Sequence, residues 1–203
     1  MRPLLSWKQA GLLLIVAVGV LLLWPRKKSA SPAPPLLCGT AGASYVAELT
    51  RLRQLKDSLF RTDPASPIPA ETRNRFTGLR YFPTDLAWRV SGRYEPLPNA
   101  LAPIVGAVWV PLPTYPSCKA PARLLVYGER DGRLYVAFWD STAAQGLTYE
   151  GGRYVPLERW GDSACLDFNR AYFPYCAYNP HYICLPYPPE NRLCLPILAG
   201  ERW

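Results

Sequence analysis

The stretch that decides the fold runs from Arg123 to Trp139. It consists of Arg123-Leu-Leu-Val-Tyr127, then Gly128-Glu-Arg-Asp-Gly132, then Arg133-Leu-Tyr-Val-Ala-Phe-Trp139. Two short runs of aliphatic and aromatic residues flank a segment that ends in Asp-Gly, an arrangement typical of a β-hairpin. We therefore expect two antiparallel strands joined by a tight turn.

Further short strands are expected on both sides of this hairpin. Residues Trp88–Glu95 alternate between apolar and polar, and Ile104–Val110 is a continuous β-rich run. Similar runs follow at Arg153–Leu157, Ala164–Asn169 and Arg192–Leu198. The 23 prolines disfavour a mostly helical body. The pattern predicts a mainly β domain, an antiparallel barrel or sandwich.

One amphipathic helix should precede the strands, over Tyr45–Phe60. Leucines recur there at three- or four-residue spacing, at Leu49, Leu52, Leu55 and Leu59. Ser44 is the expected N-cap, and Asp63-Pro64 should end the helix.

The N-terminal segment has the composition of a membrane anchor. Ala10 to Trp24 is an uncharged, mostly apolar run, and basic residues flank it on both sides. A cleaved signal peptide is the alternative, but Lys28 and Pro34 disfavour cleavage after Ala30 or Ala33. We expect an anchor at 1–28, a Ser/Pro/Gly linker at 29–43 and one β-rich domain at 44–203.

The charge distribution indicates a membrane surface and no nucleic acid. The net charge is +8, and five of the cationic residues lie within residues 1–28, which leaves 8 − 5 = +3 for the rest. The orientation of the anchor is not decided by its flanking charges, and a folded domain after a single anchor favours an extracytoplasmic location. The six cysteines are compatible with an oxidising compartment.

Several motifs carry a resemblance to a known family. They are Phe60-Arg61 with Ser66-Pro67, Phe76-Thr-Gly-Leu-Arg-Tyr-Phe82, the segment from Phe138 to Tyr154, and the block Asp167-Phe-Asn-Arg-Ala-Tyr172 with Cys176-Ala-Tyr178, Cys184 and Pro188-Pro-Glu-Asn191. Over residues 45–201 the chain resembles the prokaryotic domain-of-unknown-function family sixteen-eighty-four. Phe173 stands where that family usually has Asn, and Trp139 where it usually has Arg. The resemblance implies a single domain and a shared C-terminal loop, and it brings no activity or cofactor.

The C-terminal third supplies the candidate ligand-binding residues. Alternation along Ala164–Asn169 places Asp167 and Asn169 on the face opposite to the apolar one. Arg153 either binds an anionic or carbonyl group or pairs with a structural carboxylate such as Asp167. The full set of candidates is Tyr149, Arg153, Asp167, Asn169, Arg170, Tyr172, Tyr178, Glu190 and Asn191. We expect Arg153, Asp167, Asn169, Tyr172 and Glu190 to converge on one cavity.

The loop between Cys176 and Cys184 contains His181, the single histidine of the chain. A disulfide, free thiols and a metal site are three alternatives for it, and the missing fourth ligand disfavours a metal. We favour the disulfide.

The sequence indicates a membrane-tethered, extracytoplasmic β-domain that binds a small molecule or a cell-envelope component. An enzyme is the alternative, either a hydrolase or a flavin-type barrel oxidoreductase with a polar site around Arg153, Asp167 and Glu190. A partner-docking module without chemistry is a third. The sequence identifies no catalytic residue, cofactor or metal.

Overall fold

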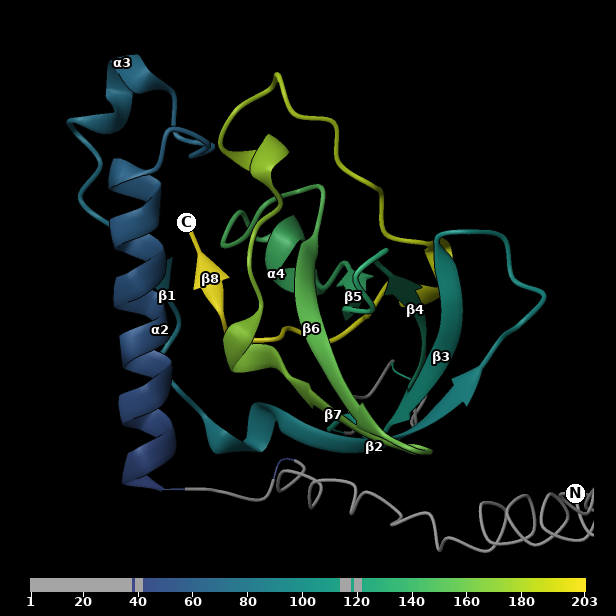
Figure 1. Cartoon of the computed structure of the whole chain (residues 1–203). Helices are drawn as coiled ribbons and strands as arrows, with labels where there is room; N and C mark the ends of the chain where they lie inside the picture. Colours follow the sequence, from purple (N-terminus) through teal and green to yellow (C-terminus); the bar gives the residue numbers. More distant parts are fainter. Residues whose placement is uncertain (1–37, 39–41, 114–117, 119–121) are drawn as a thin grey trace, which may run out of the picture. The chain divides into compact units, whose positions relative to one another are not determined.

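A closed antiparallel β-barrel forms the body of the protein (Figure 1). The structure is a computed structural model that describes residues 38, 42–113, 118 and 122–203. The six barrel strands are β2 (Arg89–Pro96), β3 (Ile104–Val110), β4 (Ala122–Gly128), β5 (Leu134–Phe138), β6 (Arg153–Trp160) and β7 (Ser163–Asp167). Each strand pairs with the next, and β2 pairs with β7 to close the barrel. The expected mainly β, barrel-like class is confirmed.

The hairpin predicted from the sequence joins β4 to β5. Tyr127 pairs with Tyr135 and Gly128 with Leu134. Gly132 has a φ of +85°, a left-handed conformation that residues with a side chain rarely adopt. The Asp-Gly signal therefore marks the turn because the turn requires this glycine.

The alternation along β7 separates the core from the outer wall. Leu166 and Ala164 point into the barrel core, and Phe168, just beyond the strand, is fully buried in it. Cys165 and Asp167 alternate with them and face outward, as the sequence predicts. The residues after Asp167 form a short 3-10 turn, η2 (Phe168–Arg170), so the strand ends two residues before the expected Asn169.

The C-terminal segment fills the barrel core without forming the expected strand at Arg192–Leu198. Leu193, Leu195 and Ile197 are buried in the core, so the alternation is real. Arg192 forms an isolated parallel bridge with Trp139, and among the described residues no ladder continues along the rest of the segment, because it packs inside the barrel. The chain ends in β8 (Glu201–Arg202), which pairs with β1 (Arg80–Tyr81) in a separate two-stranded sheet beside the barrel.

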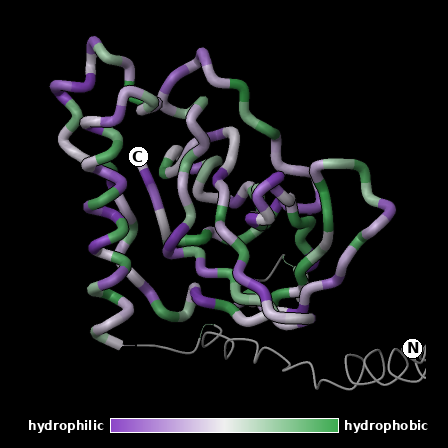
Figure 2. Tube along the Cα trace, in the orientation of Figure 1, coloured by the Kyte–Doolittle hydropathy of each residue, from purple (hydrophilic) through white to green (hydrophobic). Residues whose placement is uncertain are grey.

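The helix α2 (Ala43–Thr62) stands beside the barrel and the small sheet (Figure 1). It is longer than expected: Gly42 is its N-cap, so Ser44 lies inside the helix, and Asp63 is its C-cap. Hydrophilic and hydrophobic residues follow each other along its whole length (Figure 2). Leu49 and Phe60 are buried, whereas Leu55 and Leu59 are almost half exposed, at 48% and 46%. The leucine spacing therefore identified the helix but only part of its buried face.

Five further short helical elements occur in the described chain. Two are α-helical, α3 (Ala70–Arg73) and α4 (Ser141–Ala144), and three are 3-10 turns, η1 (Leu86–Trp88), η3 (Tyr175–Ala177) and η4 (Pro189–Asn191). None of the helices within the described ranges is long and apolar enough to cross a bilayer. The expected anchor at 1–28 lies outside the described residues. Of the expected linker at 29–43, the structure describes only residues 38, 42 and 43.

Candidate functional site

A groove lies between α2 and the outer wall of the barrel, and we call it the helix–barrel groove. It consists of a cavity of about 190 Å³ and a second cavity of about 400 Å³. Leu49 and Leu52 of α2, Pro156 of β6 and Arg170 line both cavities, so the two adjoin. Three of these four residues are apolar, so the groove has an apolar floor with charged walls.

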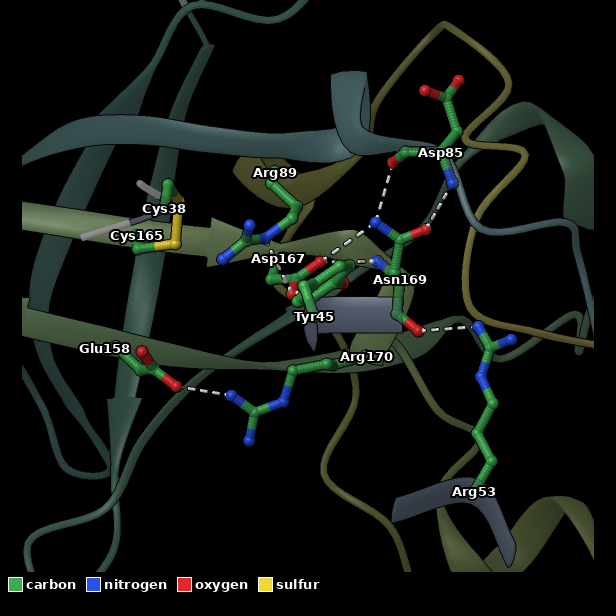
Figure 3. Close-up of polar contacts among 10 residues, drawn as sticks. All are labelled: Cys38, Tyr45, Arg53, Asp85, Arg89, Glu158, Cys165, Asp167, Asn169 and Arg170. Carbon is green, nitrogen blue, oxygen red and sulfur yellow. Dashed lines mark hydrogen bonds and ion pairs between the residues drawn. A yellow bond between two sulfur atoms is a disulfide. The ribbon is translucent and has the colours of Figure 1, made fainter. Parts of the chain in front are cut away.

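Asp167 is held at the end of β7 by contacts from both sides of the groove (Figure 3). The Tyr45 hydroxyl of α2 donates a hydrogen bond of 2.8 Å to Asp167 Oδ2. Arg89 of β2 lies 3.4 Å from the same oxygen, and its guanidinium stacks on the Tyr45 ring at 4.0 Å. Burial, and then the bond to Asp167, raise the pKa of Tyr45 well above its ordinary value. Tyr45 is therefore a neutral donor to a carboxylate.

Asn169 uses both ends of its amide in structural contacts. Its Nδ2 donates to the carbonyl of Asp85 at 2.8 Å and its Oδ1 accepts from the Asp85 amide at 3.0 Å (Figure 3). Its own amide donates to Asp167 Oδ1. Arg53 of α2 donates to the Asn169 carbonyl at 3.2 Å. Asn169 thus connects α2, β7 and the loop before η1, and its side chain is not available to a ligand.

Arg170 and Tyr172 are more accessible. Arg170 forms an ion pair of 2.5 Å with Glu158, and the side chains are 35% and 48% exposed. Both Arg170 and Tyr172 also line an open hollow of about 580 Å³ that extends toward the β4–β5 hairpin. Burial, followed by repulsion from Glu129, raises the pKa of Tyr172 to about 12. Tyr172 therefore stays protonated at physiological pH.

Lys56 and Glu201 close the other end of the groove. Lys56 Nζ lies 2.5 Å from Glu201 Oε1 and sits over the ring of Tyr172 at 4.8 Å. Glu201 is 1% exposed, so its charge is balanced by a partly buried lysine. This pair joins α2 to β8.

Arg153 lies in the protein interior and not in the groove. Its partner is Asp140, at 2.6 Å, and not Asp167 as the sequence suggested. It also donates to the carbonyls of Ile197 and Ala199, and both charged side chains are almost fully buried, at 1% and 2% exposure. Arg153 therefore fixes the C-terminal segment inside the barrel, which is the structural alternative considered for it.

Asn191 is also structural. It is fully buried, and its side chain bonds to the amide and carbonyl of Leu125 in β4 and to the carbonyl of Ala137 in β5. It bridges two strands that pair with each other only at the hairpin end. Its neighbour Glu190 is exposed.

Tyr149 and Tyr178 pack against the C-terminal residues. Tyr149 contacts the rings of Phe173 and Trp203, and Tyr178 donates to Glu201 Oε2 at 2.7 Å. The structure thus brings Asp167, Asn169, Arg170 and Tyr172 together at the groove. It separates Arg153, Glu190 and Asn191 from them, so the expected convergence of Arg153 and Glu190 with Asp167 does not occur.

Three disulfides hold the described segments together: Cys38–Cys165, Cys118–Cys194 and Cys176–Cys184. The third is the disulfide favoured for the C-terminal loop, and it removes Cys176 and Cys184 as metal ligands. In the part of the chain that the structure describes, no cluster of three or more His, Cys, Asp or Glu side chains is placed to hold a metal ion.

The groove residues that sequence reasoning missed come mostly from α2. Tyr45, Arg53 and Lys56 face the barrel together with Leu49. Counted from Tyr45, Leu49 lies four, Arg53 eight and Lys56 eleven residues further along the helix, and this spacing places all four on one face. A search for this spacing among polar residues, as well as leucines, would have found them.

The architecture is that of a small antiparallel barrel with one helix against its wall and a polar-lined groove between the two. A solution NMR structure of an uncharacterized protein from gene locus rrnAC0354 of Haloarcula marismortui is similar. Its TM-score is 0.62, its identity 30%, and the match covers 79% of this chain and 95% of that chain. A comparison with curated proteins gave no match.

The chain belongs to the family described as "Protein of unknown function (DUF1684)", whose model matches residues 74–202. The family resemblance expected from the sequence is confirmed. The matched region begins after α2, so it contains the barrel wall of the groove but not the helical one.

Proposed function

We propose that this protein is a membrane-tethered, extracytoplasmic binding domain whose ligand occupies the helix–barrel groove. The ligand is a small molecule or a cell-envelope component with an apolar part and an anionic or carbonyl group. The groove supports this pairing because Leu49, Leu52 and Pro156 provide apolar contact while Arg170 provides a bidentate cation.

The observation that carries the proposal is the position of Arg170. It lines both cavities of the groove and the adjoining open hollow. Its present partner, Glu158, is half exposed, and an ion pair at such a site is worth only about 0–1 kcal/mol. A ligand anion can therefore replace Glu158 at little cost, whereas the buried pair of Arg153 and Asp140 cannot be exchanged in this way.

The three disulfides support an extracytoplasmic location. Disulfides persist in oxidising compartments and are rare in the cytosol. The tether itself is supported by the apolar run at Ala10–Trp24 with its basic flanks. Mapping of the mature N-terminus tests the tether: a start at Ala30 or beyond, with the protein in the soluble fraction, contradicts it.

The enzyme alternative, a hydrolase or a flavin-type oxidoreductase, has less support. Its polar site required Arg153, Asp167 and Glu190 in one place. Asp167 is saturated by Tyr45, Arg89 and Asn169, and no second carboxylate is paired with it as a proton-transfer partner among the described residues. Binding is the function that this geometry favours.

Native mass spectrometry of the full chain, purified from its own host, tests the binding proposal. We expect the wild type to retain a small molecule, and Arg170→Gln to lose it. Arg93→Gln is the matched control, because Arg93 is an exposed arginine on β2 that does not line the groove. Retention that is equal in Arg170→Gln and wild type would contradict the assignment of the site.

A further inference from the structure

Another cavity lies at β8, and we call it the aromatic pocket. Its volume is about 330 Å³, within the range of small-molecule sites. Its walls come from the segment between α2 and β1, from the start of the Cys176–Cys184 loop, and from the C-terminal residues. Glu201 is the one lining residue that this pocket shares with the 190 Å³ cavity of the groove.

Aromatic rings supply most of the interior. Phe76, Phe173, Tyr178 and Trp203 all line the pocket, with Ile68 and Leu79 as further apolar residues. The rings of Phe173 and Trp203 are 4.4 Å apart, and that of Tyr178 meets Trp203 edge-on at 6.4 Å. Phe173 is only 1% exposed and packs behind Trp203, so Phe76, Tyr178 and Trp203 are the rings that can contact a flat ring of a ligand.

The buried carboxylate in the pocket wall is already paired, so it does not draw a cationic ligand into the pocket. Glu201 Oε1 takes the Lys56 ammonium, and Oε2 accepts from the Phe173 amide and the Tyr178 hydroxyl, each at 2.7 Å. Burial, and then the charge of Glu201, raise the pKa of Tyr178 far above its ordinary value, so the hydroxyl is a neutral donor. The wall is therefore electrically balanced before any ligand enters.

The other charged side chains that line the pocket are positive. Arg80 and Arg202 both line it, both are exposed, and they lie directly opposite each other in the β1–β8 pair. Like charges at opposite positions of an antiparallel pair destabilise it. No salt bridge joins either arginine to a carboxylate of the described chain. An anion bound between them would relieve this repulsion.

We infer that the aromatic pocket binds a flat, ring-containing monoanion, whose ring packs among Phe76, Tyr178 and Trp203 and whose acidic group pairs with Arg80 and Arg202. Apart from Glu201, this site shares no lining residue with the helix–barrel groove. It discriminates by charge as well as by shape, because an uncharged ring compound gains the apolar contacts but supplies no anion to Arg80 and Arg202.

Isothermal titration calorimetry with 2-naphthoate and with the uncharged 2-naphthylmethanol tests the inference on the full chain. We expect the wild type to bind the anion about tenfold more tightly than the alcohol. This factor corresponds to the lower end of the range for hydrogen bonds to charged groups, because both arginines are exposed. The double variant Arg80→Gln/Arg202→Gln should bind both probes equally. Trp203→Ala should weaken both probes together and keep the preference, and Trp203 is 43% exposed, so its loss is tolerated by the fold.

Two controls separate this site from general effects. Arg75→Gln removes an exposed arginine that does not line the pocket, and it should leave the preference unchanged. Arg170→Gln, which alters the helix–barrel groove, should also have no effect on naphthoate. Equal affinity of the wild type for the two probes, no binding of either probe, or the same loss of preference in Arg75→Gln would each overturn the inference.

Discussion

Replacement of Arg153 by methionine should be one of the most damaging single changes in the barrel. Methionine fills the space of the aliphatic stem but removes the guanidinium, which is the cation paired with the buried Asp140. The carboxylate would keep its bonds from the Thr142 amide and hydroxyl and from the Ile197 amide. It would have no opposite charge, and loss of one partner from a buried pair typically costs about 3–5 kcal/mol.

The same change also leaves the carbonyls of Ile197 and Ala199 without their donor. We therefore expect the free energy of unfolding to fall by about 4 kcal/mol. The free energy of unfolding of a whole domain is typically about 5–15 kcal/mol, so this is a large part of it. Asp140→Asn in the Arg153→Met background should recover some of this stability, because the asparagine removes the buried charge while its oxygen still accepts from the backbone.

Equilibrium unfolding in urea, without reductant and followed by tryptophan fluorescence, measures these free energies. Arg159→Met is the matched control, since Arg159 lies on the same strand but is exposed. It should cost less than about 1 kcal/mol. If Arg153→Met cost no more than Arg159→Met, or if the double variant were less stable than Arg153→Met alone, the buried pair would not be what fixes the C-terminal segment.

Three further predictions follow from the same contacts. Asn191→Ala should cost at least about 2 kcal/mol in the same assay, because it leaves one buried and two partly buried backbone groups of β4 and β5 without partners; a near-neutral effect would mean that water replaces the amide. The pair Cys176→Ser/Cys184→Ser should lower the free energy of unfolding by about 2–3 kcal/mol, the entropy of closing a short loop, and an unchanged urea midpoint would contradict this. Tyr172 has a raised pKa of about 12, so the unfolded chain loses this proton first and stability should fall as the pH rises from about 10 toward 12; Tyr172→Phe should make that fall less steep, and an identical slope would show that Tyr172 does not contribute.

Local chemistry explains why the hairpin was predictable from the sequence and the segment Arg192–Leu198 was not. A turn such as Asp131-Gly132 depends on its own residues, because glycine is required where φ is positive. Alternation, in contrast, records which side chains are buried and not which backbone groups are paired. Leu193, Leu195 and Ile197 alternate as a strand does, yet they are buried by the barrel around them.

At the candidate site, too, local features were predictable from the sequence and contacts between distant elements were not. The outward direction of Asp167 followed from the period of two along β7, which is a local property. The partner of Arg153 did not follow, because Asp140 lies just beyond β5 and the register of β5 against β6, which places Phe138 opposite Arg153, brings the two together. The helical wall of the groove required the docking of α2, and the pattern of leucines alone does not contain that information.

The Cys38–Cys165 disulfide determines where mechanical load enters the domain. Cys38 precedes α2, and its partner lies on β7 in the closed barrel. A pulling force applied through the N-terminal segment therefore passes across the sulfur–sulfur bond to β7 and bypasses the helix. The contacts of α2 with the barrel, including the bond from Tyr45 to Asp167, do not carry this force. The helix–barrel groove can keep its shape while the chain before it is under tension.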